Sequence, residues 1–165
     1  SGSGKTSVTV GLLRALSRRG EAVAPVKVGP DFIDPLHHEA ASGQPSNTVD
    51  SWMLIPEQNR RVLARQAVGR DVVVVEGVMG MFDGAGATDD RGSTAEMARI
   101  LDLPVVLVVD VWSMARSVAA VVRGFVEFAP DVDFAGVLLN RFAGEGHFEL
   151  CETAIENACG VPVLG

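Results

Sequence analysis

The chain opens with the glycine-rich segment SGSGKT at residues 1–6, which leads directly into a run with the apolar spacing of a helix. That helix is predicted to end at Gly20, and its apolar residues are Val8, Val10, Leu12, Leu13 and Leu16. In a phosphate-binding loop, backbone amides surround phosphate oxygens, a lysine reaches the outer phosphates and a hydroxyl holds Mg²⁺. The segment therefore predicts nucleotide binding, and the alternative is a Gly/Ser linker followed by a helix cap. Because no strand precedes the loop, we expect the chain to begin inside a larger protein.

Short β-branched segments alternate with helical segments along the rest of the chain. We expect strands over 22–28, 71–75, 104–109, 134–139 and 161–164, and helices over 57–68, 93–101, 113–128 and 147–158. Continuous apolar strands are typical of a parallel sheet that is covered on both faces. The alternation predicts an α/β fold with a doubly wound, mostly parallel sheet of the P-loop NTPase type, whose first strand is missing. Ligands of such folds bind beyond the carboxyl ends of the strands.

Length and composition restrict the function classes. The 165 residues, of which 47% are hydrophobic, predict one domain over 1–165 with a substantial core. A net charge of −7 argues against binding to nucleic acid or to an anionic membrane. Because no apolar run has the roughly 20 residues that span a bilayer and no signal peptide is recognisable, we expect a cytoplasmic protein. Cys151 and Cys159 lie eight residues apart in one predicted helix, too far for a disulfide, and are expected to be packing residues.

Several charged residues follow the predicted strand 22–28. The segment KVGPDFIDPLHH at 27–38 holds a lysine, two carboxylates and two imidazoles at the carboxyl end of that strand. Its glycine and prolines are typical of an ordinary turn, but a turn does not explain why Lys27 ends an apolar strand. Adjacent His37 and His38 are weak evidence for a metal site, because neighbouring side chains of a regular helix or strand cannot both face one ion.

A third cluster follows the apolar run 72–75. Glu76 comes directly after this strand, where an acid can hold Mg²⁺ directly or through water, and it is the strongest metal-ligand candidate after Thr6. The segment 77–92 is rich in glycine and aspartate, and it predicts either a lid over a substrate or a disordered connection. Two single residues give weaker signals: Asp50 is a further acid or a helix cap, and Asn140 contacts a nucleotide base or belongs to a turn.

Six segments taken together resemble the ATP-dependent amidoligase domain of cobyrinic acid a,c-diamide synthases, which include the hydrogenobyrinic acid enzymes. The segments are SGSGKT, KVGPDFIDPLHH, NTVDSWM, VVVEGVMGMFDG, GSTAEMARILDLPVVLVVD and GVLLNRFAGEGH. The phosphate loop alone is common to many proteins, whereas KVGPDFIDPLHH combined with EGVMGMFDG is specific. Cobyric acid synthases and dethiobiotin synthetases resemble the chain mainly in fold and phosphate loop, so the resemblance implies a dethiobiotin synthetase-like fold.

The resemblance implies ATP and Mg²⁺ as cofactors and a corrinoid polycarboxylate as substrate. In the family, a substrate carboxylate attacks the γ-phosphate of ATP to give an acyl phosphate, and ammonia then displaces the phosphate. The a- and c-carboxylates are amidated in turn, with ammonia that a glutaminase domain releases from glutamine. That domain is absent between residues 1 and 165, and neither cysteine fits its nucleophile. Basic groups that could favour a polyanionic substrate are Lys27, Arg91, Arg116 and Arg141.

The family motifs also imply individual site residues. The predicted catalytic residues are Lys27, Asp31, Asp34 and Asp83. The predicted nucleotide-binding residues are Ser3, Gly4, Lys5, Thr6 and Ser7, with Asn140 hydrogen-bonded to adenine by similarity with dethiobiotin synthetases. The predicted metal ligands are Thr6 and Glu76, and similarity with dethiobiotin synthetases adds Asp50.

Other functions remain open on the sequence. A dethiobiotin synthetase-like ligase, or an amidating enzyme for another tetrapyrrole, could use the same motifs. A MinD/ParA-like ATPase switch would have a second lysine near the start of the loop, which residues 1–4 lack, and often a basic amphipathic tail. A structural domain with a decayed site is a further alternative, against which the retained lysines and acids argue. The sequence leaves open whether the protein forms a homodimer.

Overall fold

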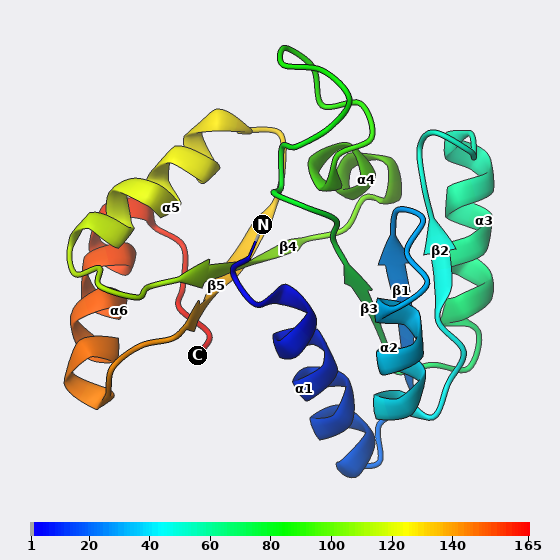
Figure 1. Ribbon diagram of the computed structural model, residues 1–165, viewed down its shortest axis with the longest axis horizontal. Helices are drawn as coiled ribbons and strands as arrows, with labels where there is room; N and C mark the ends of the chain where they lie inside the picture. The colour runs from blue at the N-terminus through cyan, green and yellow to red at the C-terminus, as the bar shows by residue number, and fades with distance from the viewer. Residues whose placement is uncertain (1) are drawn as a thin grey trace. The chain divides into compact units, whose positions relative to one another are not determined.

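The computed structural model describes residues 2–165, and Ser1, the first residue of the predicted phosphate loop, lies outside the described residues (Figure 1). The chain forms two compact units. The first unit comprises residues 5–102, and the second comprises residues 2–4 and 103–165. Each unit is described by itself below, and the assignment of 1–165 to one domain stays a prediction.

The first unit is a parallel three-stranded sheet with four helices. Its elements in chain order are α1 (Lys5–Arg18), β1 (Val23–Val28), α2 (Asp34–Ser42), β2 (Asn47–Val49), α3 (Pro56–Ala67), β3 (Val72–Glu76) and α4 (Thr94–Leu101). The strand order is β2-β1-β3, and β1 is buried at every position, as expected for a central strand. Leu13 of α1 and Ala41 of α2 pack with Val23 of β1 in the core. In the register of the sheet, Lys27 pairs with Glu76, so these two charged residues lie side by side at the carboxyl ends of β1 and β3.

The second unit contains a parallel pair of strands with two helices. Its elements are β4 (Val105–Asp110), α5 (Ser117–Phe128), β5 (Phe134–Asn140) and α6 (Glu145–Cys159). Asp110 pairs with Asn140 at the carboxyl ends of β4 and β5. The parallel pairing in both units and the alternation of strands with helices confirm the predicted α/β class. Cys151 and Cys159 are free thiols, as predicted.

Three local features differ from what the sequence led us to expect. The segment expected to be a strand over 161–164 forms a single parallel bridge between Val137 and Val163, because Pro162 has no N–H to extend the ladder. The segment 27–38, for which the sequence left an ordinary turn as the alternative, enters the unpredicted helix α2 at Asp34, where Pro35 favours the first helical turn. The short strand β2 was not predicted.

In the described part of the chain, no helix has the length and apolar character required to cross a membrane.

Candidate functional site

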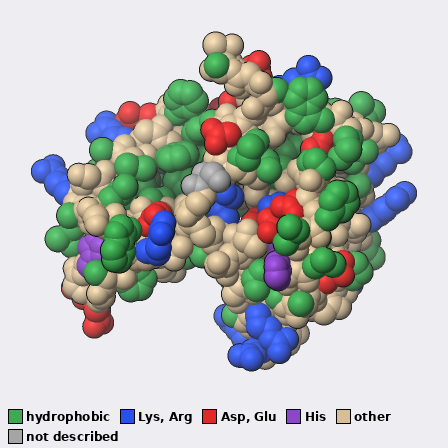
Figure 2. Space-filling view, in the orientation of Figure 1, with side chains coloured by type: hydrophobic (Ala, Val, Ile, Leu, Met, Phe, Trp, Pro, Cys, Tyr) green, Lys and Arg blue, Asp and Glu red, His purple; other side chains and the backbone are tan. Residues whose placement is uncertain are grey.

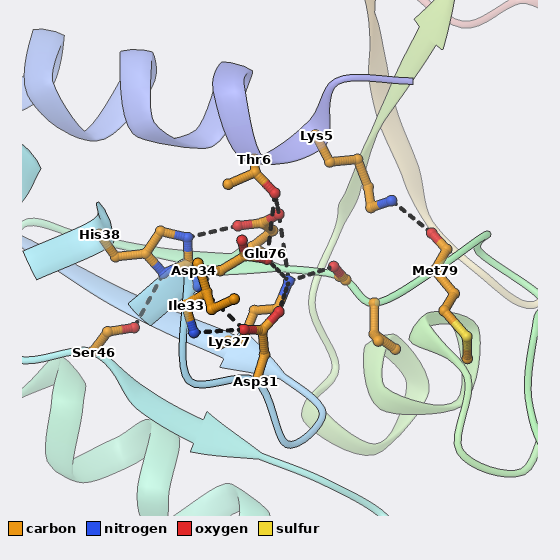
Figure 3. A network of polar contacts seen from close by, with 12 residues as sticks. Lys5, Thr6, Lys27, Asp31, Ile33, Asp34, His38, Ser46, Glu76 and Met79 are labelled. Carbon is orange, nitrogen blue, oxygen red and sulfur yellow. Dashed lines mark hydrogen bonds and ion pairs between the residues drawn. The ribbon is translucent and has the colours of Figure 1, made fainter. Parts of the chain in front are cut away.

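The main cluster of charged side chains in the first unit lies where β1 and β3 end, beside the first turn of α1 (Figure 3). Lys27 comes from β1, Glu76 from β3 and Thr6 from α1. Because both strands are parallel and in register, their last residues emerge at the same edge of the sheet. The fold therefore assembles residues that lie as many as 70 positions apart in the chain.

Glu76 is at the centre of this cluster, and both of its carboxylate oxygens are hydrogen-bonded. The Thr6 hydroxyl donates to Oε1 over 2.6 Å, and His38 Nε2 lies 2.6 Å from Oε2. The Glu76 side chain is only 1% exposed. A carboxylate this deeply buried needs such partners to remain ionised.

Lys27 neutralises the acidic groups around it. Its Nζ lies 2.6 Å from Asp34 Oδ2, 3.4 Å from Glu76 Oε1 and 4.0 Å from Asp31 Oδ2. The lysine side chain is 4% exposed. The sequence interpretation, that a simple turn cannot explain Lys27, is consistent with this arrangement, because the lysine is the cation that faces buried Glu76 and the partly exposed carboxylates of Asp31 and Asp34.

The electrostatics favour charged carboxylates. Burial raises the pKa of Glu76, but hydrogen bonds from His38 and Thr6 and the charge of Lys27 outweigh burial and hold that pKa below its ordinary value. Burial also opposes ionisation of Asp34, yet its hydrogen bond with Lys27 lowers the pKa of Asp34. Burial lowers the pKa of the Lys5 ammonium, and the charge of Glu76 opposes that shift.

The lowered pKa of Glu76 predicts a pH-dependent contribution to stability. The folded chain binds this proton less readily than the unfolded chain, so the contribution is fully present above pH 4.5 and is lost as the pH falls through the folded-state pKa. We expect Glu76→Gln to destabilise the full-length protein at pH 7 and to differ less from the wild type near pH 3. Urea unfolding across this range measures the difference. Glu149→Gln, at an exposed residue of α6, is the control, and a pH-independent difference would contradict the prediction.

Lys5 contacts the segment that follows β3. Its Nζ donates to the Met79 carbonyl over 2.6 Å (Figure 3), and Asp83 Oδ2 accepts a hydrogen bond from the Gly80 amide. The predicted lid 77–92 contains no helix or strand, but it is anchored where it leaves β3. The Thr94 hydroxyl accepts a hydrogen bond from the Val78 amide and donates one to the Val78 carbonyl.

The oxygen donors of the first unit fit Mg²⁺ better than a transition metal. The Thr6 hydroxyl lies 3.3 Å from Asp34 Oδ2 and 2.6 Å from Glu76 Oε1, so one hydroxyl and two carboxylates converge. Within residues 2–165, no group of three or more His, Cys, Asp or Glu side chains is placed to hold a metal by itself. Mg²⁺ prefers few carboxylates and completes its shell with water and nucleotide phosphates, which matches this incomplete set.

Asp50 and Asp31 have local structural roles. Asp50 is buried, and its Oδ1 accepts hydrogen bonds from the amides of Trp52 and Met53, which stabilises a turn. The N-cap of the next helix, α3, is Ile55, so the helix-cap alternative for Asp50 is wrong. Asp31 Oδ1 accepts hydrogen bonds from the amides of Ile33 and Asp34, which stabilises the entry into α2. The proposed metal role of Asp50 stays a prediction.

In the second unit, the start of the predicted phosphate loop packs against the end of β5. Asn140 Nδ2 donates to the Ser3 carbonyl over 2.8 Å, and a Cβ atom at Gly4 would collide with this amide. Gly4 also has a φ of 89°, which residues other than glycine rarely adopt, so both the close contact and the backbone conformation favour glycine at this position. Arg141 forms an ion pair with Asp110, whose pKa is lowered by the Trp112 amide and by this arginine. The amide of Asn140 therefore holds the loop, and its predicted contact with adenine stays a prediction.

Two polar residues of the cluster were not among the predicted site residues: His38, which was considered only as weak evidence for a metal site, and Ser46. His38 is fully buried on α2, and its ring joins Glu76 to Ser46, whose Oγ lies 3.1 Å from Nδ1. The signal was present in the sequence, because Asp34 and His38 are four residues apart and share one face if 34–42 is helical. Because no helix was predicted over 34–42, that spacing was not used. Ser7 lies exposed in the first turn of α1.

Comparisons with known proteins find relatives that match the whole chain. The cobyrinate a,c-diamide synthase of Priestia megaterium is 46% identical to the chain over 165 residues, which are 100% of the chain and 36% of that protein. The hydrogenobyrinate a,c-diamide synthases of Brucella anthropi and Streptomyces coelicolor are 52% and 49% identical, again over 100% of the chain and over 37% and 34% of those proteins. The chain thus spans about a third of the length of these curated relatives.

A solved structure supports the fold alone. Chloroplast FtsY from Physcomitrella patens matches with a TM-score of 0.64 at 17% identity, covering 99% of the chain and 54% of that protein's chain. A family model described as the CobQ/CobB/MinD/ParA nucleotide binding domain matches residues 1–165. Because the family model matches all of residues 1–165, the chain belongs to the CobQ/CobB/MinD/ParA nucleotide binding domain family, and its glycine-rich loop and parallel α/β fold are consistent with that family.

Proposed function

We propose that residues 1–165 are the ATP- and Mg²⁺-dependent amidoligase part of a cobyrinic or hydrogenobyrinic acid a,c-diamide synthase in cobalamin biosynthesis. The observation that carries the proposal is the convergence of the Thr6 hydroxyl, Glu76 and Asp34 beside Lys27 at the carboxyl ends of β1 and β3. The names of relatives at 46–52% identity support the substrate class. Ammonia would come from a glutaminase part of the full-length protein.

The reaction has two steps whose bonds balance. A substrate carboxylate oxygen attacks the γ-phosphorus of ATP, the bond to the β,γ-bridging oxygen breaks, and ADP leaves. Ammonia then attacks the acyl carbon, the bond to the phosphate oxygen breaks, phosphate leaves and the nitrogen releases a proton. Neither step needs a protein nucleophile, so the protein contributes positioning and charge neutralisation.

The residues of the cluster match that task. Bound Mg²⁺ would neutralise charge on the outer phosphates, with Thr6 and Glu76 as its protein ligands. Lys5 would exchange its bond with the Met79 carbonyl for a phosphate oxygen. Lys27 holds Asp34 ionised next to this region, where a carboxylate can orient the substrate or the incoming ammonia.

Exposed apolar residues that follow β1 and β2 support a large, partly apolar substrate. Phe32 is 85% exposed after β1, and Trp52 is 55% exposed after β2. The Arg91 guanidinium lies 4.5 Å from the centre of the Trp52 ring, which adds a cation beside an aromatic face. Figure 2 shows hydrophobic side chains at several places on the surface of the first unit, on the right. A macrocycle with peripheral carboxylates is complementary to this surface, because its ring is apolar and its carboxylates are negatively charged.

The assay that tests the proposal uses the full-length protein with ATP, Mg²⁺, glutamine or ammonia, and cobyrinic or hydrogenobyrinic acid. We expect ADP release coupled to the mass change of carboxylate to amide, up to two amides per macrocycle. Release of ADP without amidation would instead favour another carboxylate substrate or an ATPase switch. Absence of both products would favour a decayed site.

Asp83 offers a test of substrate handling. Asp83→Asn is expected to lower the rate of amidation by about tenfold or more, while ATP affinity changes less than about twofold, because the loop acid would orient the substrate and not the nucleotide. Asp89→Asn, at an exposed acid in the same loop, is the matched control. Steady-state kinetics and nucleotide titration measure the two effects, and an equal loss of ATP binding would remove Asp83 from this role.

A further inference from the structure

The buried imidazole of His38 ends the segment KVGPDFIDPLHH but has no role among the catalytic, nucleotide-binding and metal-binding residues assigned above. It is 0% exposed, and α2 places it between β3 and the segment that leads into β2. Its Nε2 lies 2.6 Å from Glu76 Oε2, and its Nδ1 lies 3.1 Å from Ser46 Oγ (Figure 3). Both ring nitrogens therefore have partners, and the orientation of the ring is fixed at two points.

The chemistry of the pair determines the direction of the bond. An ionised carboxylate only accepts hydrogen bonds, so Nε2 must carry a hydrogen whether the ring is neutral or charged. The Ser46 hydroxyl can donate a hydrogen bond to Nδ1 when the ring is neutral and accept one from Nδ1 when the ring is charged, because a hydroxyl is both donor and acceptor. The bond from His38 to Glu76 is thus independent of the charge of the ring.

This bond determines which oxygen of Glu76 faces the start of α1. With Oε2 occupied by His38, Oε1 is the atom that accepts from Thr6 at 2.6 Å and lies 3.4 Å from Lys27 Nζ. A carboxylate fixed through one oxygen cannot rotate without losing a buried hydrogen bond. The other oxygen is therefore held in one position before any ligand arrives.

We propose that His38 is a positioning residue that holds Glu76 with Oε1 presented to Thr6 for cation binding. The inference rests on the proposed metal role of Glu76. Hydrogen-bonded partners of metal ligands commonly change metal affinity tenfold to a hundredfold when they are removed. A histidine that only filled the core would affect folding but not the dependence of nucleotide binding on Mg²⁺.

The test compares variants of the full-length protein by titration with ATP at a series of Mg²⁺ concentrations. His38→Leu removes the donor at similar volume and is expected to raise the Mg²⁺ concentration for half-maximal ATP binding by about tenfold. ATP affinity without Mg²⁺ should change less than about twofold, because the nucleotide contacts are unaltered. His38→Gln, whose amide can replace the Nε2 donor, should restore most of the loss, and His37→Leu at the exposed neighbour should match the wild type.

The outcomes separate this inference from the proposed function. If Glu76→Gln shifts the Mg²⁺ dependence and His38→Leu, correctly folded, does not, the positioning role is wrong and the metal role of Glu76 stands. If Glu76→Gln has no effect either, both fail. Should His38→Leu not fold, His38→Asn replaces it, because its shorter amide cannot reach Glu76, and equal Mg²⁺ dependence of the Asn and Gln variants would overturn the inference.

Discussion

Glu76→Gln is expected to lower amidation by the full-length protein about a thousandfold, since a metal ligand that stabilises transferred phosphoryl charge supplies several kcal/mol. The substitution keeps the shape of the side chain and removes its charge. It leaves an amide where Thr6 and Lys27 now meet a carboxylate. The rate of coupled ADP release and product formation, measured at saturating ATP and Mg²⁺, gives the effect.

The control for this experiment is Glu57→Gln, because Glu57 is an exposed acid at the start of α3. We expect that variant to keep the wild-type rate. Circular dichroism at pH 7 should show a folded Glu76→Gln protein, so that the loss belongs to chemistry. Near-normal amidation by the folded variant would remove Glu76 from the metal site.

The second large effect concerns stability. Lys27→Met is expected to destabilise the fold by about 3 kcal/mol or more, because removal of one partner from a buried ion pair leaves an uncompensated charge. Here the lysine faces Asp34 at 2.6 Å and Glu76 at 3.4 Å, and Glu76 is almost fully buried. Urea unfolding of the full-length protein at pH 7 measures the loss.

A double variant shows whether charge is the cause. Adding Asp34→Asn to Lys27→Met removes one of the unpaired carboxylates and should recover about 1 kcal/mol, within the usual range for coupled neighbours. Asp34→Asn alone should be destabilising, because it breaks the same pair. If the double variant is no more stable than Lys27→Met, the lysine acts through packing of its methylene groups.

Much of the fold follows from local sequence signals. The apolar runs that became β1 and β3 and the capped segment that became α4 were placed within one or two residues, since β-branched runs and an N-cap serine act locally. The short strand β2 and the helix α2 were missed. A three-residue strand has too few positions to show a period, and the turn residues at the start of α2 masked its helical spacing.

The site was predicted unevenly for a similar reason. Thr6, Lys27, Asp34 and Glu76 were selected from motifs, and the structure brings all four together. Asp50 was added by similarity with dethiobiotin synthetases, yet its carboxylate accepts hydrogen bonds from two local amides. A motif identifies which residues carry useful chemistry but not which partner each of them meets.

The sequence by itself determined the α/β alternation, the glycine loop at the start of α1 and the acids and lysine that follow the strands, because these depend on residues near one another in the chain. Only the tertiary structure decided that Lys27 faces three carboxylates and that buried His38 holds Glu76. Asp31 and Asp34 lie four and seven positions from Lys27, but the contacts of Glu76 with His38 and Lys27 join segments about 40 to 50 positions apart. They depend on the parallel register of β1 with β3, which no local pattern specifies.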